Sequence, residues 1–389
     1  MIDIGHPAEM RALKPLLGKN HRVDVILQFM DLSHNHISDQ SDRLMGGQVN
    51  IDTTGESTRT ASMDLRDPEN RLKLDDNAPA DGSLFFTKMF RIIFVVSPPD
   101  NSVHYAVPIF TGPISKVTRN GPIVSVECQG KESLSFASIW AGRTLKKGIK
   151  KTEAILKVMG WTGETKFKFI DKDARIGGTG ISAARTKKFT FWKLAKMLAN
   201  SMNLQLFYDG RGVLRLRRIP GHSVYTFRDD GVMLTPPQVN YEMNEEFCNA
   251  VEIIGGKPKG SKKKVKYKLV APRSHPLSPW NIGRNGTPRY VPKIIEDDSI
   301  KSHKIARARA KRELQNSLVE SVDVSFDSLP VPMLEELDYC RYNSNDSHGT
   351  FRLKQMSIPL TVDGTSSIGY LKKVKPRYKG TRRRRRHHH

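Results

Sequence analysis

Alternating apolar and polar residues predict β-strands along most of the chain. In residues 21–30, written HRVDVILQFM, one face carries Val23, Val25, Leu27 and Phe29. A period of two places such side chains together on the buried face of a strand. The pattern recurs in residues 59–66 and 123–128, and Asn120-Gly121 is typical of a hairpin turn. Residues 21–140 therefore predict a run of strands with no helix between them, as in a β-sandwich or β-barrel.

The spacing of apolar residues becomes helical in residues 141–220. KKTEAILKVMG predicts a short helix capped by Thr152, and TFWKLAKMLAN predicts a second helix capped by Thr190. A hairpin that turns at residues 209–212 follows them. We expect a small inserted α/β domain with its own core, formed by Trp161, Phe191, Leu194, Leu198 and Phe207.

Strand patterns return after residue 221, with three interruptions. These are a lysine-rich loop (257–268), a proline-rich segment expected to be an extended arm (271–292), and a helix at 301–318. The apolar stripe of that helix comprises Ala306, Ala310, Leu314 and Leu318. The predicted fold is mainly β, with two β-barrels, an inserted α/β domain and an arm-helix segment. The predicted parts are an N-terminal arm (1–20), a first barrel (21–140), the insert (141–220), a second barrel (221–370) and a basic C-terminal tail (371–389).

A net charge of +24 indicates an anionic partner. Residues 257–268 hold seven lysines, residues 371–386 hold ten Lys or Arg, and neither segment holds an acid, which leaves +7 for the rest. We therefore expect a mildly basic folded body with the excess charge on one loop and one tail. The candidate contacts to an anionic partner are Lys262, Lys263, Lys264, Arg382, Arg383, Arg384, Arg385 and Arg386.

The chain contains no motif that assembles a catalytic, cofactor-binding or metal site. The three cysteines are far apart and are expected to be buried. His34 and His36 could form half of a metal site with Asp31 and Asp39, but a polar loop is the favoured interpretation. Acidic pairs such as Glu335-Glu336 look like surface residues. We predict no enzyme and no cofactor, and we expect a soluble chain without a secretion signal that folds in a reducing cytoplasm.

The order of these parts resembles the tail hub (baseplate hub or minor tail) proteins of tailed bacteriophages. STRTASMDLRDPENRL and VPIFTGPISKVTRNGPIVSVECQGKE are similar to segments of the first hub barrel. TFWKLAKMLANSMNLQLFYDGRGVLRLRRIP is similar to the insert, and HPLSPWNIGRNGTPRY with VDVSFDSLPVPMLEELDYC resembles the arm and second barrel. Together these stretches cover most of residues 21–370.

The resemblance implies a structural virion protein at the tail tip, assembled in the host cytoplasm. Two barrels per chain in a homotrimer would present six positions to a sixfold tail tube. The implied partners are the tail tube or a distal tail protein, the tape-measure protein, tip or fibre proteins and passing genomic DNA. A binder of nucleic acid or anionic surfaces that does not read sequence, acting through the basic loop and tail, is the alternative.

Overall fold

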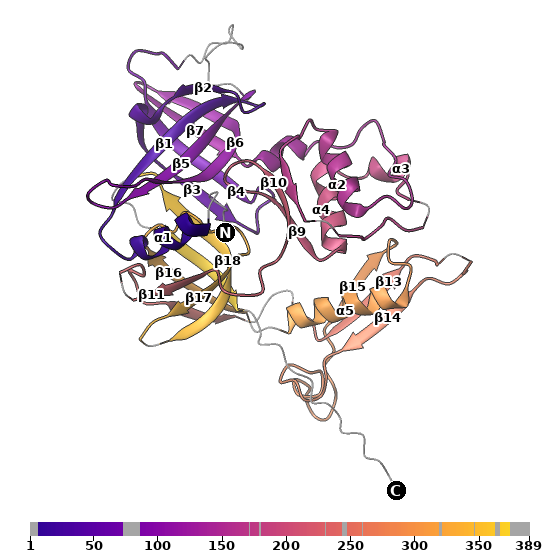
Figure 1. Ribbon diagram of the computed structural model, residues 1–389. Coiled ribbons are helices and arrows are strands. Elements are labelled where there is room, and N and C mark those ends of the chain that lie inside the picture. Colours follow the sequence, from indigo (N-terminus) through magenta and orange to yellow (C-terminus); the bar gives the residue numbers. More distant parts are fainter. Residues whose placement is uncertain are drawn as a thin grey trace. The chain divides into compact units, whose positions relative to one another are not determined.

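The computed structural model describes residues 7–72, 86–170, 172–178, 180–229, 231–242, 247–258, 260–318, 321–345, 347–361 and 366–373. The chain divides into two compact units, each described here by itself (Figure 1). The first unit comprises Met1–Gln238 and Val324–Leu371, and the second comprises Val239–Asp323 and Lys372–His389. The predicted second barrel (221–370) thus contributes to both units, and the division into two barrels stays a prediction.

A large, mostly antiparallel sheet dominates the first unit, so the prediction of a mainly β chain is confirmed. Its path runs β16-β19-β18-β3-β4-β7-β6-β5-β1-β2, and β17 pairs with both β18 and β11. The strands of the N-terminal part are β1 (Arg22–Asp31), β2 (His36–Asp39), β3 (Leu44–Asp52), β4 (Arg59–Arg66), β5 (Lys88–Ser97), β6 (Tyr105–Asn120) and β7 (Ile123–Gln129). The later strands are β11 (Tyr225–Arg228), β16 (Ser321–Ser328), β17 (Tyr339–Asn343), β18 (His348–Pro359) and β19 (Ser366–Lys373), while β12 (Gln238–Glu242) lies at the boundary of the units.

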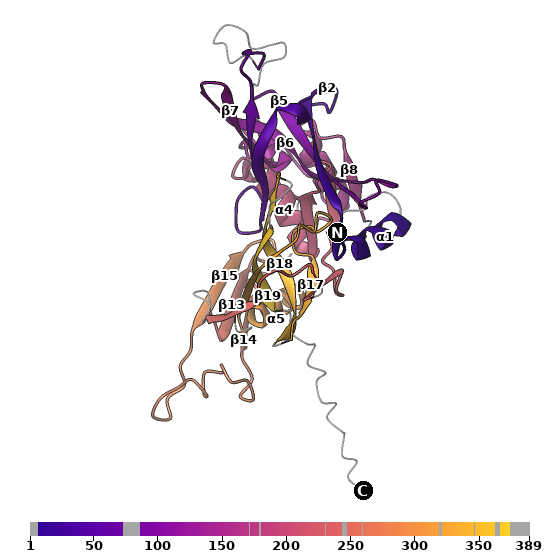
Figure 2. The same ribbon diagram turned by 90° about the vertical axis from the view of Figure 1, so that its left-hand side faces the viewer.

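The alternating residues form the core of this sheet. Leu27 and Phe29 of β1 are buried, and so are the inward residues of β4 and β7. Gly121 has a φ of 58° in the tight turn between β6 and β7, which confirms the predicted hairpin. β3 pairs with β18 in the register Ile51↔Met356, so strands from opposite ends of the sequence lie side by side (Figure 2).

Residues 7–17 form a helix that the sequence analysis did not predict. α1 (Pro7–Leu17) buries Leu13 and Leu17 completely, and Lys14 Nζ donates a hydrogen bond to Val224 O at 2.7 Å. The segment expected to be an arm is thus packed at its C-terminal end. Two short 3-10 helices, η1 (Ser41–Arg43) and η2 (Lys131–Ser135), complete this part of the chain.

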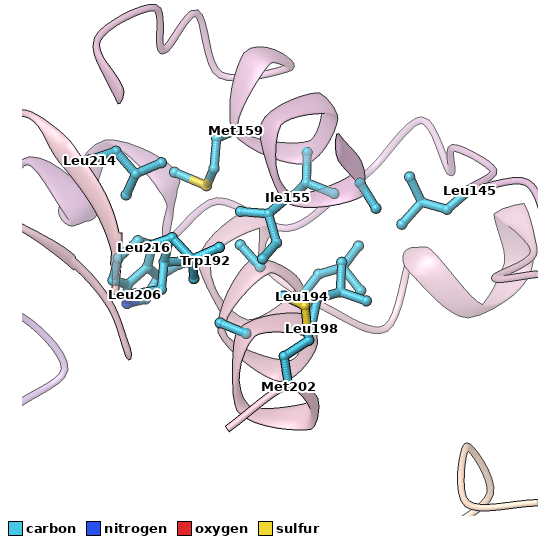
Figure 3. Close-up of a cluster of buried hydrophobic side chains, with 14 of the residues drawn as sticks. Leu145, Ile155, Met159, Trp192, Leu194, Leu198, Met202, Leu206, Leu214 and Leu216 are labelled. Atoms are coloured by element: carbon cyan, nitrogen blue, oxygen red, sulfur yellow. The ribbon is translucent and has the colours of Figure 1, made fainter. Parts of the chain in front are cut away.

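The insert has the separate core that was predicted, drawn in Figure 3. Leu194 and Leu198 are buried in it, and Trp161 and Phe191 pack against it half-buried. The prediction that Phe207 belongs to this core was wrong. Phe207 is buried on the opposite face of β9, where Cζ of Arg217 lies 4.6 Å from the centre of its ring. The elements are α2 (Lys151–Gly160), α3 (Ala183–Thr186), α4 (Phe191–Ser201), β8 (Phe167–Phe169), β9 (Leu204–Tyr208) and β10 (Leu214–Arg218).

One of the two predicted helix caps is confirmed. Thr190 Oγ1 accepts a hydrogen bond from Lys193 N at 3.1 Å at the start of α4. Thr152 is not a cap, because α2 already begins at Lys151 and Thr152 is buried inside its first turn.

The second unit is a three-stranded sheet with one helix. Its order is β14 (Lys266–Val270), β13 (Ala250–Gly255) and β15 (Pro292–Asp297). The helix is α5 (His303–Ser317), whose stripe of Ala306, Ala310 and Leu314, continued by Leu318, is buried against the sheet as predicted.

The proline-rich segment is not an extended arm but a loop closed at its base. Asn249 has no exposed surface and holds both ends of the loop. Its backbone oxygen accepts from Ala271 N at 2.8 Å, and its Oδ1 accepts from Val291 N at 2.8 Å. Inside the loop, Arg273 lies over the ring of Trp280 at 4.8 Å. Local turns and one buried asparagine therefore satisfy backbone groups that an extended arm would offer to a neighbour.

No helix in the described part of the chain is long and apolar enough to cross a bilayer.

Candidate functional site: a buried polar junction and the basic surfaces

A buried ion pair connects the two ends of the first unit. Arg59, at the start of β4, donates hydrogen bonds to Ile109 O of β6 and to Glu335 Oε2. The side chains of Arg59 and Glu335 are 5% and 1% exposed. Residues 276 positions apart in sequence are thereby fixed to each other inside the protein. Breaking such a pair on one side leaves an uncompensated buried charge.

The insert joins the same junction through the face of β9 that carries Phe207. Gln205 Nε2 donates to the backbone oxygen of Glu336 at 3.0 Å and to its Oε1 at 3.1 Å. Arg217 Nη2 donates to the same backbone oxygen at 2.9 Å and lies 3.1 Å from Asp338 Oδ1. The insert is thus attached to residues 335–338 by hydrogen bonds, and those from the guanidinium of Arg217 are charge-assisted and therefore stronger than neutral ones.

Two buried carboxyl groups, those of Glu335 and Glu132, have raised pKa values. Burial raises the pKa of Glu335 to about 7, although the neighbouring Arg59 opposes that shift. Burial also raises the pKa of Glu132, helped by the nearby charge of Glu336. The expectation that Glu335-Glu336 is a surface pair was wrong, because its cationic partners are far away in the sequence. In the acidic pair Asp297-Asp298, by contrast, Asp298 is exposed.

A second polar contact joins the β1–β2 turn to the insert. Lys131 Nζ lies 2.7 Å from Glu164 Oε2 and 2.9 Å from His34 Nε2, and Tyr208 donates to the same Glu164 oxygen at 2.8 Å. Burial and the adjacent cations Lys131, Lys166 and Arg91 lower the pKa of His34 to about 3, so its ring is neutral at physiological pH.

The turn of the insert hairpin packs directly against β6. A Cβ added to Gly210 would lie 2.1 Å from Pro108 O, and Thr111 Oγ1 donates to Gly210 O at 2.8 Å. Glycine is required at this position because the two backbones touch. Together these contacts hold the insert in a fixed position against the sheet.

The candidate residues for half of a metal site make other contacts: His34 contacts Lys131, and the rest bond within the turn. Asp31 Oδ1 accepts from Ser33 N and Asn35 N at 2.8 Å, and His36 pairs with Asp39 at 3.0 Å. Among the described residues no cluster of three or more His, Cys, Asp or Glu is placed to hold a metal ion. Cys128, Cys248 and Cys340 are buried and unpaired with one another, as expected.

The structure describes part of the predicted anionic-partner site. Lys262, Lys263 and Lys264 are exposed in the connection between β13 and β14, and Lys264 Nζ lies 3.5 Å from Asp298. Arg382, Arg383, Arg384, Arg385 and Arg386 lie outside the described residues. The binding role of both groups stays a prediction.

Comparisons of sequence find no counterpart: no family model and no curated protein matches the chain. Comparison of structures finds similar proteins. A tail protein from Neisseria meningitidis MC58 superposes with a TM-score of 0.60 at 12% identity, covering 90% of this chain and 97% of the other. The 43 kDa tail protein of prophage MuSo2 from Shewanella oneidensis gives a TM-score of 0.58 at 12% identity, covering 90% and 98%. The prophage tail protein gp18 from Listeria monocytogenes EGD-e gives 0.53 at 9% identity, covering 90% and 95%.

The chain has the fold of phage tail proteins. Because 90% of this chain is covered in each comparison, the shared fold extends over nearly all of the chain. The resemblance inferred from the sequence motifs is confirmed at the level of the fold. All three structures are described as tail proteins.

Proposed function

We propose that the chain is a structural virion protein that forms the hub at the tip of a phage tail. The observation that carries this proposal is the match of 90% of the chain to three tail proteins along at least 95% of their own lengths. A match of a single domain would leave the role open, because one fold serves many functions. A match of the whole arrangement makes a shared role the simplest explanation.

The hub is a homotrimer that adapts the sixfold tail tube to distal tip or fibre proteins. In this proposal each chain contributes two tail-tube-like barrels, one from residues 21–140 and one from the strands of residues 221–370. The exposed edge of the large sheet supports such an assembly. β2 ends the sheet path with Ile37 40% exposed, and an unpaired edge strand is a surface on which another chain can add.

The buried junction suits a protein that transmits load. Arg59, Glu335 and Arg217 lock the N-terminal strands, the insert and the C-terminal strands to one another. Buried ion pairs contribute little net stability, but they fix a particular geometry. A hub between a tube and a tip needs a defined geometry more than it needs a cavity. The tail tube or a distal tail protein, the tape-measure protein and tip or fibre proteins are the partners we assign to it.

A second function is favoured by a different observation. The basic loop and tail give the chain 17 positive charges without an acid, which suits a polyanion such as genomic DNA. Few aromatic side chains accompany these cations, so the interaction would be salt-sensitive and independent of sequence. We place this binding second, as contact with DNA passing through the hub.

Antibody labelling of virions tests the location. Gold-labelled antibody against the folded chain, imaged in negative stain, should mark the end of the tail that lies farthest from the capsid. Label along the whole tail tube, on the capsid, or absent from purified particles would contradict the proposal. A chain that is absent from purified particles but binds duplex DNA would favour nucleic-acid binding as its main function.

A further inference from the structure

The cationic surface of the second unit extends beyond the lysine-rich loop. Residues 260–318, all of which the structure describes, hold 15 Lys or Arg against 4 Asp or Glu. Twelve of the basic residues are exposed, and so are two of the acids, Glu296 and Asp298. Seven of the twelve lie outside the lysine-rich loop, in the proline-rich loop and in or next to α5. The expectation that the excess charge lies only on one loop and one tail was therefore wrong.

The proline-rich loop combines exposed arginines with exposed aromatic rings. Residues 271–291 hold Arg273, Arg284 and Arg289, all exposed, and no Asp or Glu. Tyr290 is 52% exposed and Trp280 is 36% exposed. The two rings meet edge to face with their centroids 6.2 Å apart, and the guanidinium of Arg273 covers the ring of Trp280 at 4.8 Å. Trp280 thus contacts both neighbours, while half of Tyr290 stays open to solvent.

The backbone that carries these side chains is held by hydrogen bonds of its own. Arg289 N donates to Pro279 O at 2.9 Å, and both residues directly precede an aromatic residue in the sequence. Asn281 Nδ2 donates to Arg273 O at 2.9 Å, and Asn249 closes the base of the loop. Side chains on a preformed backbone lose little freedom when a ligand covers them, so the loop is prepared for binding.

We propose that the proline-rich loop binds single-stranded nucleic acid without reading its sequence, with Tyr290 as the ring on which a base stacks and Arg284 and Arg289 as contacts to phosphate. The proposal rests on the nucleic-acid contact placed second above and gives that contact a site. Proteins that hold single strands in this way combine cations along the backbone with aromatic rings under the bases.

The close spacing of ring and cations favours this ligand over other polyanions. A single strand carries one phosphate for every base, so it satisfies Tyr290 and the adjacent Arg289 together. A duplex offers the same phosphates, but its bases are stacked inside and leave the ring unused. An acidic polypeptide offers carboxylates to the arginines and no base to the ring.

Fluorescence anisotropy of the full chain with a labelled 20-nucleotide oligo(dT) and with a labelled duplex of the same length tests the site. Tyr290→Ala should weaken binding of the single strand about fivefold or more and leave binding of the duplex unchanged. Tyr290→Phe keeps the ring and should bind both as the wild type does. The basic tail contributes to both ligands, so the difference between them reports on the ring.

The arginines are tested by the salt dependence of single-strand binding. Arg284→Gln/Arg289→Gln should flatten the slope of log K against log salt by about 0.7 per lost phosphate contact. The matched control is Lys187→Gln/Lys188→Gln, which removes the same charge at exposed lysines of the insert and should leave the slope unchanged. Circular dichroism should show every variant folded.

Each alternative result has a distinct meaning. Equal losses for both ligands in Tyr290→Ala, or no loss for the single strand, would overturn the stacking site. An equal effect of the lysine control would show that binding follows net charge, which also overturns it. If poly-L-glutamate bound as tightly as the oligonucleotide and Tyr290→Ala weakened both, the loop would recognise an acidic polypeptide instead. A wild-type chain that binds neither oligonucleotide would overturn the site and the second function together and leave the hub standing, because antibody labelling tests the hub separately.

Discussion

Replacing Arg59 with glutamine should destabilise the protein more at pH 8 than at pH 5.5. The cause lies in its partner, because burial raises the pKa of Glu335 to about 7. The ordinary pKa of this group is 4.5, so between about 4.5 and 7 the folded state binds more protons than the unfolded state. The contribution of Glu335 to stability therefore falls as pH rises through this window. When Glu335 is ionised, its attraction to the guanidinium of Arg59 offsets part of this loss of stability.

The magnitude follows from the burial of both groups. Without Arg59 the buried carboxylate can take up a proton, so at pH 8, about one unit above the pKa of Glu335, the variant loses about 1.4 kcal/mol more than at low pH. At pH 5.5 Glu335 is protonated, and the variant loses hydrogen bonds worth about 1–2 kcal/mol in total. With about 2–4 °C per kcal/mol for a domain of this size, the loss in Tm is roughly 5–14 °C at pH 8 and roughly 2–8 °C at pH 5.5.

Thermal unfolding followed by circular dichroism at the two pH values measures this difference. Lys116→Gln is the matched control, since Lys116 pairs with Glu127 at 2.9 Å with both side chains more than half exposed. Such a surface pair contributes about 0–1 kcal/mol at either pH. Adding Glu335→Gln to Arg59→Gln should remove the difference between the two pH values, because no titrating carboxyl group is left at this site. An equal loss of Tm at both pH values, or a loss no larger than that of Lys116→Gln, would refute the reasoning.

Four further outcomes are expected. Leu198→Ala, in the core of the insert, should cost about 2–5 kcal/mol in thermal unfolding, and an unchanged melting curve would show that α4 is misplaced. Gly210→Ala forces a Cβ to within 2.1 Å of Pro108 O and should lower Tm, whereas Gly221→Ala, with open space around it, should not. Asn249→Ala should speed tryptic cleavage within residues 271–291 without unfolding the unit, and equal cleavage rates would show that Asn249 does not close the loop. Deleting residues 382–389 should impair tail-tip assembly with the fold intact. Normal assembly with a salt slope for DNA binding flatter by roughly 0.9 per lost phosphate contact would favour nucleic acid instead.

Local signals in the sequence predicted the local structure well. The hairpin at Asn120-Gly121, the cap at Thr190 and the alanine stripe of α5 each depend on neighbouring residues, and each was confirmed. The predicted cap at Thr152 was wrong because the apolar pattern does not fix the first residue of a helix, and α2 begins one residue earlier. The assignment of Phe207 to the core of the insert was wrong because every residue of β9 is buried, so alternation does not show which face points to that core.

These local signals could not predict contacts between residues that lie far apart in the sequence. Glu335 looked like a surface acid because its partner, Arg59, is 276 residues away. Asn249 closes the proline-rich loop from outside it, and no pattern inside the loop indicates this. The positive charge of the insert, in contrast, could have been found by counting charges per domain, since residues 141–220 hold 19 Lys or Arg against 5 Asp or Glu.

The central claim is that three copies of this chain form the hub at the end of a phage tail. A cryo-electron microscopy reconstruction of the assembled tail tests it most directly, because the fold can be recognised and its copies counted around the axis. The account predicts three copies in a closed ring between the tail tube and the distal tip. Six copies, a single copy, or a ring at the capsid end of the tail would contradict it.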